Sequence, residues 1–138
     1  MTKKKKGWIT ALIIIGVIVI AIAVGGIALV GELKKNLDYL VNLEFEQIDL
    51  NQIQDGVYEG EYSLFPVSAK VAVNVSGHKI IKVTIIDHGN GKGEAAEVIV
   101  EKVVEEQKLE VDSISGATYS SRVILLAIED ALKKAQRN

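Results

Sequence analysis

The first 30 residues and the rest of the chain carry different hydrophobic patterns. From Trp8 to Val30 there are 23 consecutive uncharged residues, most of them Ile, Val, Ala or Leu. A helix of that length spans roughly 34 Å, which is enough to cross a hydrocarbon core of about 30 Å. A lone segment in lipid must satisfy its own backbone hydrogen bonds, and only a helix does so. We therefore predict a transmembrane helix over residues 8–30.

Beyond residue 55 the apolar positions alternate with polar ones, as in half-buried strands. This pattern predicts strands over 56–62, 67–75 and 81–85. The residues 76–79 (Ser-Gly-His-Lys) supply a tight turn between the last two, which predicts an antiparallel hairpin. A glycine-rich loop, residues 87–93, follows the third strand.

The spacing then becomes helical. An apolar stripe predicts a helix over 94–107, and a second stripe predicts one that begins near 118–121 and ends near 135. Between them, residues 109–114 are expected to form a short extended segment. This order predicts an α+β fold, a small antiparallel sheet with packed helices, preceded by one N-terminal transmembrane helix.

Charge orients the predicted membrane segment. Lys3–Lys6 precede it, whereas all 18 acidic residues and only 12 of the 16 basic ones follow Val30. The positive-inside rule then predicts a cytoplasmic basic tail (1–7), an exported juxtamembrane stalk (31–54) that begins as a short amphipathic helix, and an exported domain (55–138). The alternative is a signal peptide cleaved after the small-x-small residues 21–23. The apolar run continues past that site, which favours an uncleaved anchor.

Composition excludes several functions. The exported part is net acidic, which argues against nucleic acid as a partner. The absence of cysteine excludes a disulfide scaffold, a thiolate metal site and a cysteine nucleophile. The two histidines, His78 and His88, and the scattered acids show no metal-ligand spacing, so we expect no metal site.

The segment 112–121 (DSISGATYSS) concentrates hydroxyl groups at the predicted start of the last helix. Backbone N–H groups at a helix start, flanked by hydroxyls, form a ready phosphate site. Gly116 and Ala117 are small enough to leave Thr118 accessible to another surface. The alternative is that Ser115 or Thr118 is simply the N-cap of the helix.

This segment resembles the flavinylation signature of the FMN-binding domain proteins, which is Asp, two variable residues, then Ser/Thr-Gly-Ala-Thr. Asp112–Thr118 matches every specified position. The family includes the C subunit of the Na+-translocating NADH:quinone reductase, the G subunit of the Rnf complex and small extracellular flavoproteins. The similarity extends across 55–138, through residues 55–60, 85–88 and 107–112.

The resemblance implies a covalent cofactor. In this family a separate Mg2+-dependent flavin transferase uses FAD, and the hydroxyl of the final Thr attacks the FMN-side phosphorus and releases AMP. FMN would then be joined to Thr118 by a phosphoester, and Asp112 would be read by the transferase. The remaining candidate cofactor-binding residues are Ser115, Gly116, Ala117, Ser120 and Ser121 around the phosphate, and His88, which we expect to face the isoalloxazine ring. Tyr58 and Tyr119 are candidates to stack on that ring.

The resemblance implies electron transfer rather than stand-alone catalysis. The expected partners are the flavin transferase and a membrane or surface redox protein such as a quinone-linked reductase. Two alternatives stay open, namely a membrane-tethered interaction module without redox activity, and reversible FMN binding without the covalent bond.

Overall fold

The structure is a computed structural model that describes residues 2–89 and 93–137. It divides into two compact units, Met1–Lys35 and Asn36–Asn138. Asn90, Gly91 and Lys92, the middle of the predicted glycine-rich loop, lie outside the described residues.

α1 (Thr2–Asn42) is a single helix. Its residues up to Lys35 lie in the first unit, and its last turns are part of the second unit. The part of α1 from Lys6 onward is long and apolar enough to cross a membrane. Its large apolar side chains between Trp8 and Val30 are exposed. The helix predicted over 8–30 is therefore confirmed as a helix. The helix expected at the start of residues 31–54 is also confirmed, and it is continuous with the preceding helix, because α1 runs without a break to Asn42.

The second unit is built on a three-stranded antiparallel sheet of order β1-β2-β3. Its strands are β1 (Gly56–Leu64), β2 (Val67–Ser76) and β3 (Lys79–Gly89). The predicted β2–β3 hairpin is confirmed, and Gly77 and His78 form its turn with φ of 58° and 61°. Two successive positive φ values are those of the tight turn whose twist matches that of the strands.

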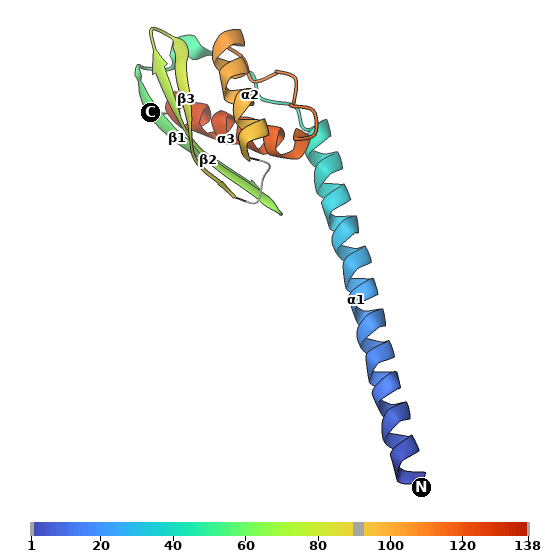
Figure 1. The fold of residues 1–138 in the computed structure, drawn as a ribbon. Coiled ribbons are helices and arrows are strands. Elements are labelled where there is room, and N and C mark those ends of the chain that lie inside the picture. Colours follow the sequence, from blue (N-terminus) through green and yellow to red (C-terminus); the bar gives the residue numbers. More distant parts are fainter. Residues whose placement is uncertain (1, 90–92, 138) are drawn as a thin grey trace. The chain divides into compact units, whose positions relative to one another are not determined.

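Both helices of this unit pack on the same face of the sheet (Figure 1). α2 (Gly93–Glu106) lies against β3, and α3 (Thr118–Gln136) lies across β1 and β2. Every second residue of β2 from Val67 to Val75 is buried, as its alternating pattern predicted. The α+β class is confirmed.

The contact between α3 and β1 is made through Gly60. A Cβ atom at this position would lie 2.2 Å from the carbonyl oxygen of Ala127 and 2.3 Å from the backbone nitrogen of Ala131. The backbones of the helix and the strand are therefore closer together here than any side chain allows. Gly60 sets how deeply α3 sits on the sheet.

Two irregularities in β3 change which of its residues face the helices. The register with β2 shifts between Asn74 and Val75 and again between Lys70 and Val71. The second shift leaves Ile86 as an extra, unpaired residue, so that His88 pairs with the buried Ala69. A bulge of this kind exchanges the two faces of a strand beyond it. His88, rather than Asp87, is therefore on the helix-covered face.

The segment expected to be a stalk contributes to the core of the second unit. Leu40, Phe45 and Ile53 are buried, and a short 3-10 helix, η1 (Leu50–Gln52), precedes β1. Arg122 of α3 donates hydrogen bonds to the carbonyl oxygens of Leu40 and Leu43, and its guanidinium lies 4.4 Å from the centre of the Phe45 ring. Burial lowers the pKa of Arg122. These contacts fasten the segment to α3.

The extended segment expected over 109–114 does not form a strand. Its backbone contains a γ-turn centred on Glu110, in which the N–H of Val111 donates to the carbonyl oxygen of Leu109 at 2.9 Å. The side chains of Leu109 and Val111 are nevertheless buried in the core. The apolar alternation of this segment therefore reflects two side chains that anchor a loop.

Candidate functional site

The hydroxyl-rich segment begins with a tight turn over residues 114–117. The N–H of Ala117 donates to the carbonyl oxygen of Ile114 at 2.9 Å, and Gly116 has φ of 77°. A positive φ at the third residue of a turn favours glycine, since it has no Cβ to clash. The turn presents Ser115 and Gly116 to solvent.

The turn is held against α3 by a buried serine. Ser121 is fully buried, and its Oγ accepts a hydrogen bond from the N–H of Ile114 at 3.1 Å. Ala117 and Ser120 are also buried, at 5% and 4% exposure. Ala117 is the N-cap residue of α3, and its carbonyl accepts the N–H of Ser121. The first turn of α3 is thus fixed by side chains that face inward.

Thr118 is the first residue of α3 and is half-buried. Within residues 2–89 and 93–137 its hydroxyl makes no hydrogen bond. The interpretation of Ser115 or Thr118 as a helix cap is wrong, because the N-cap is Ala117 and no side chain caps the helix. The fold itself leaves the Thr118 hydroxyl unused.

Asp112 precedes the turn and is exposed. Its backbone carbonyl accepts a hydrogen bond from Lys102 Nζ at 3.4 Å, while its carboxylate makes none with the described part of the chain. It does not cap α3, which begins six residues later. Asp112 therefore presents a free carboxylate next to the turn.

His88 lies near the end of β3, on the face that the helices cover. Both ring nitrogens are buried, and neither has a hydrogen-bond partner among the residues described. Unsatisfied buried polar atoms each cost about 1–3 kcal/mol, so native proteins rarely leave them without a partner.

The strand register and Tyr119 bring these residues to one end of the unit. Leu64 and Val67 close the β1–β2 hairpin, and His88 lies two rungs away, opposite Ala69. From the first turn of α3, Tyr119 donates to the carbonyl oxygen of Phe65 in that hairpin loop at 2.6 Å. Thr118 and His88 therefore occur at the same end of the sheet.

Tyr119 is fixed in this position. Burial raises its pKa above the usual value of about 10, and a hydrogen bond from Asn36 opposes the shift only in part. Its hydroxyl stays protonated and donates at neutral pH. Tyr58, the other expected stacking residue, is elsewhere, since it pairs with Val73 toward the opposite end of β1 and donates to the carbonyl of Gln54.

Sequence reasoning missed Phe65 and Asn36 at this end. Asn36 Nδ2 also donates to the carbonyl oxygen of Phe65, at 3.0 Å. The sequence did contain a signal for Phe65, because an aromatic residue followed by proline between two predicted strands indicates a turn. The Phe65 side chain is therefore expected at that turn. No sequence pattern indicated that Asn36 reaches this loop.

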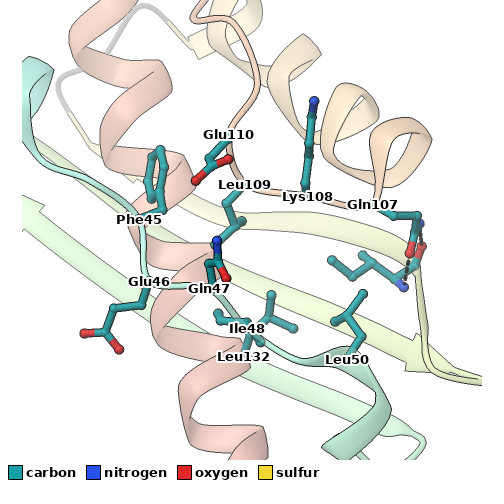
Figure 2. Close-up of a pocket in the computed structure, with 11 residues that line it drawn as sticks. Phe45, Glu46, Gln47, Ile48, Leu50, Gln107, Lys108, Leu109, Glu110 and Leu132 are labelled. Atoms are coloured by element: carbon teal, nitrogen blue, oxygen red, sulfur yellow. Dashed lines mark hydrogen bonds between the residues drawn. The ribbon is translucent and has the colours of Figure 1, made fainter.

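A separate cavity of about 240 Å³ contains none of these residues (Figure 2). It lies between the segment that follows α1 and the loop that follows α2, and Figure 2 shows the side chains that line it: Phe45, Glu46, Gln47, Ile48, Leu50, Ile80, Gln107, Lys108, Leu109, Glu110 and Leu132. Gln107 closes one side, where its amide accepts the N–H of Ile80 at 2.9 Å and donates to the Ile80 carbonyl at 2.7 Å. Over the described ranges no three His, Cys, Asp or Glu side chains gather as metal ligands would.

Comparison with known proteins finds a family model and solved structures that resemble this chain. The family model of the FMN-binding domain matches residues 65–133, half of the chain. The crystal structure of CPE2226 protein from Clostridium perfringens is similar, with 23% identity, a TM-score of 0.50, and coverage of 62% of this chain and 90% of that one. At this identity the second likeness supports the fold alone. No curated protein sequence matches significantly.

Proposed function

Because the chain belongs to the FMN-binding domain family, we propose that it is a membrane-anchored, extracytoplasmic flavoprotein that carries FMN on Thr118 through a phosphoester. FMN, when bound, supplies the electron-transfer chemistry that amino-acid side chains lack. The chain itself supplies the attachment oxygen, the position of the flavin and the anchor.

The free hydroxyl of Thr118 is the observation that carries this proposal. It lies within the matched region, at the first residue of α3, and the described part of the fold gives it no hydrogen bond. In a separate transferase, Thr118 Oγ1 would attack the FMN-side phosphorus of FAD. The new O–P bond replaces the bond to AMP, and the hydroxyl proton passes to a base of the transferase.

The surroundings of Thr118 suit both loading and retention. The turn at Gly116 and the free carboxylate of Asp112 are exposed, as recognition by a transferase requires. The N–H groups of the first turn of α3 would be available to an ester phosphate at Thr118, and the helix dipole would favour its negative charge. We assign Ser121 to holding the turn, because it is fully buried and bonded to Ile114.

His88 supports the fit of a flavin at this end of the sheet. Its two buried ring nitrogens lack partners among the described residues, and a flavin has ring nitrogens and carbonyl oxygens that can supply them. We propose that His88 hydrogen-bonds to the flavin and so fixes one edge of the ring.

The anchor is the exposed apolar part of α1. A continuous apolar surface of this size is unfavourable in water and suits a lipid environment. Lys3–Lys6 at its start favour a cytoplasmic N-terminus and an exported second unit. We propose a flavin transferase and a membrane redox protein, such as a quinone-linked reductase, as partners.

Intact-mass spectrometry of the chain produced with a flavin transferase tests the attachment. We expect a mass increase equal to FMN less water, and a yellow colour that survives denaturation. Thr118→Ala should abolish the adduct. Thr118→Ser, which keeps a hydroxyl, and Ser113→Ala, at a variable position of the signature, should retain it. An adduct that persists in Thr118→Ala would refute attachment at this oxygen.

The same experiment separates the alternatives. Reversible binding would give colour that is lost on denaturation, and an interaction module would give none. Export can be tested with a single introduced cysteine, because the chain has none of its own. Val57→Cys, at a position 64% exposed, should react with a membrane-impermeant maleimide in intact cells. Protection of this cysteine until the cells are lysed would refute the proposed orientation.

A further inference from the structure

Phe65 is an exposed aromatic residue on a fixed backbone. Its side chain is 58% exposed, and among the described residues it makes no cation–π or aromatic ring contact. Its carbonyl oxygen, by contrast, accepts hydrogen bonds from Tyr119 Oη at 2.6 Å and from Asn36 Nδ2 at 3.0 Å. The loop is therefore held in place while its ring faces water.

The two donors fix Phe65 relative to the proposed attachment residue. Tyr119 directly follows Thr118, so one tyrosine side chain separates the first turn of α3 from the Phe65 carbonyl. In FMN a phosphate and a ribityl chain separate the attachment point from the ring system. That tether is longer than a tyrosine side chain, so a flavin on Thr118 can reach the Phe65 ring.

We propose that Phe65 stacks on the isoalloxazine ring of the FMN carried by Thr118 and is a binding residue for the flavin. This inference rests on the proposed function. The flavin ring is planar and aromatic, and offset stacking on an aromatic side chain is favourable beyond the area that it buries. The tyrosines expected to do this are committed elsewhere, Tyr58 to Gln54 and Tyr119 to Phe65 itself.

His88 and Phe65 would then contact different parts of one flavin ring system. His88 offers ring nitrogens from the helix-covered face of β3, and Phe65 offers an aromatic surface from the β1–β2 loop. A stacking contact near the upper end of the usual strength favours the stacked state by about tenfold. The covalent bond keeps the flavin on the protein, while the stacking contact restricts where its ring lies.

Tryptophan substitution makes the contact measurable, because an indole in contact with a flavin quenches its fluorescence by electron transfer. The samples are the full chain with FMN attached, verified by intact mass, carrying either Phe65→Trp or Val57→Trp. Val57 is 64% exposed and lies at the other end of β1, so it is a matched control. We expect flavin fluorescence about tenfold lower in Phe65→Trp than in Val57→Trp, since about one ring in ten would be unstacked. Phe65→Ala should instead make the flavin more accessible to iodide than in the unsubstituted protein.

The outcomes distinguish the two levels of the proposal. Equal fluorescence of the two tryptophan variants, with the adduct present in both, would overturn the stacking contact alone. Absence of the adduct from the unsubstituted chain would overturn the proposed function and the stacking contact with it. Quenching confined to Phe65→Trp would support both.

Discussion

Substitution of Gly60 by alanine should destabilise the second unit severely. The added methyl would lie 2.2 Å from the carbonyl oxygen of Ala127 and 2.3 Å from the nitrogen of Ala131, whereas ordinary contact begins at 3.4 Å. Both neighbours are backbone atoms of α3, so no side-chain rotation can relieve the overlap. α3 would have to withdraw by about 1 Å, and a gap of that size forfeits a quarter to a half of each dispersion contact.

The expected cost is about 3 kcal/mol, the upper end for overpacking, because two rigid elements must separate. For a domain of this size that loss lowers the midpoint of thermal unfolding by about 12–24 °C. We would measure urea and thermal unfolding of the full chain in detergent, and separately the rate of amide hydrogen exchange in β2. Gly56→Ala is the matched control, since its methyl would meet only the Tyr58 ring, at 3.4 Å. Equal stability of the two variants, within about 1 kcal/mol, would refute this account of the α3–β1 contact.

Two further variants probe the polar contacts. Gln107→Ala should lower the free energy of unfolding by about 1–3 kcal/mol and speed hydrogen exchange at Ile80, because it leaves the Ile80 N–H and carbonyl without their Gln107 partners. The control is Gln52→Ala, at an exposed position, which should have little effect. Unchanged exchange at Ile80 would contradict this prediction. Burial raises the pKa of Asp130, but hydrogen bonds from Lys134 and the N–H of Glu61 outweigh it and hold the pKa below its usual value of about 3.9. Its stabilisation is therefore present above about pH 4 and lost as the pH falls through the lowered pKa. Asp130→Asn should be less stable at pH 7, and the difference should close as the pH falls below that lowered pKa. A difference that is constant with pH would contradict this assignment.

The sheet was predictable because burial on it follows strict alternation. In β2 every second residue is buried, and the short loop to β3 consists of residues that tolerate positive φ. The same signal failed at residues 109–114. Two buried side chains, Leu109 and Val111, alternate with polar ones there, but the backbone between them forms a γ-turn and pairs with none of the described strands. Alternation reports which side chains are buried and does not report where the backbone hydrogen bonds go.

The face on which His88 lies could not be derived from the pattern. Simple alternation from Val83 and Ile85 would place Asp87 and Gly89 toward the helices. The extra residue at Ile86 reverses this and puts His88 there instead. Nothing local in the sequence marks the bulge, because Ile86 fits an unbroken strand equally well. The proposed contact between His88 and the flavin therefore depends on a register shift that only the three-dimensional structure reveals.

The signature itself divides into residues that the fold explains and residues that it does not. Gly116 is needed for a turn with positive φ, and Ala117 is buried where the helix begins. Asp112 and Thr118 have no such role, since the carboxylate is exposed and neither side chain hydrogen-bonds to the described part of the chain. The backbone turn and the packing at the helix start would account for Gly116 and Ala117 in any protein with this turn. The second pair needs an explanation outside the fold, and recognition by a transferase for Asp112 and attachment of the flavin for Thr118 provide one for each.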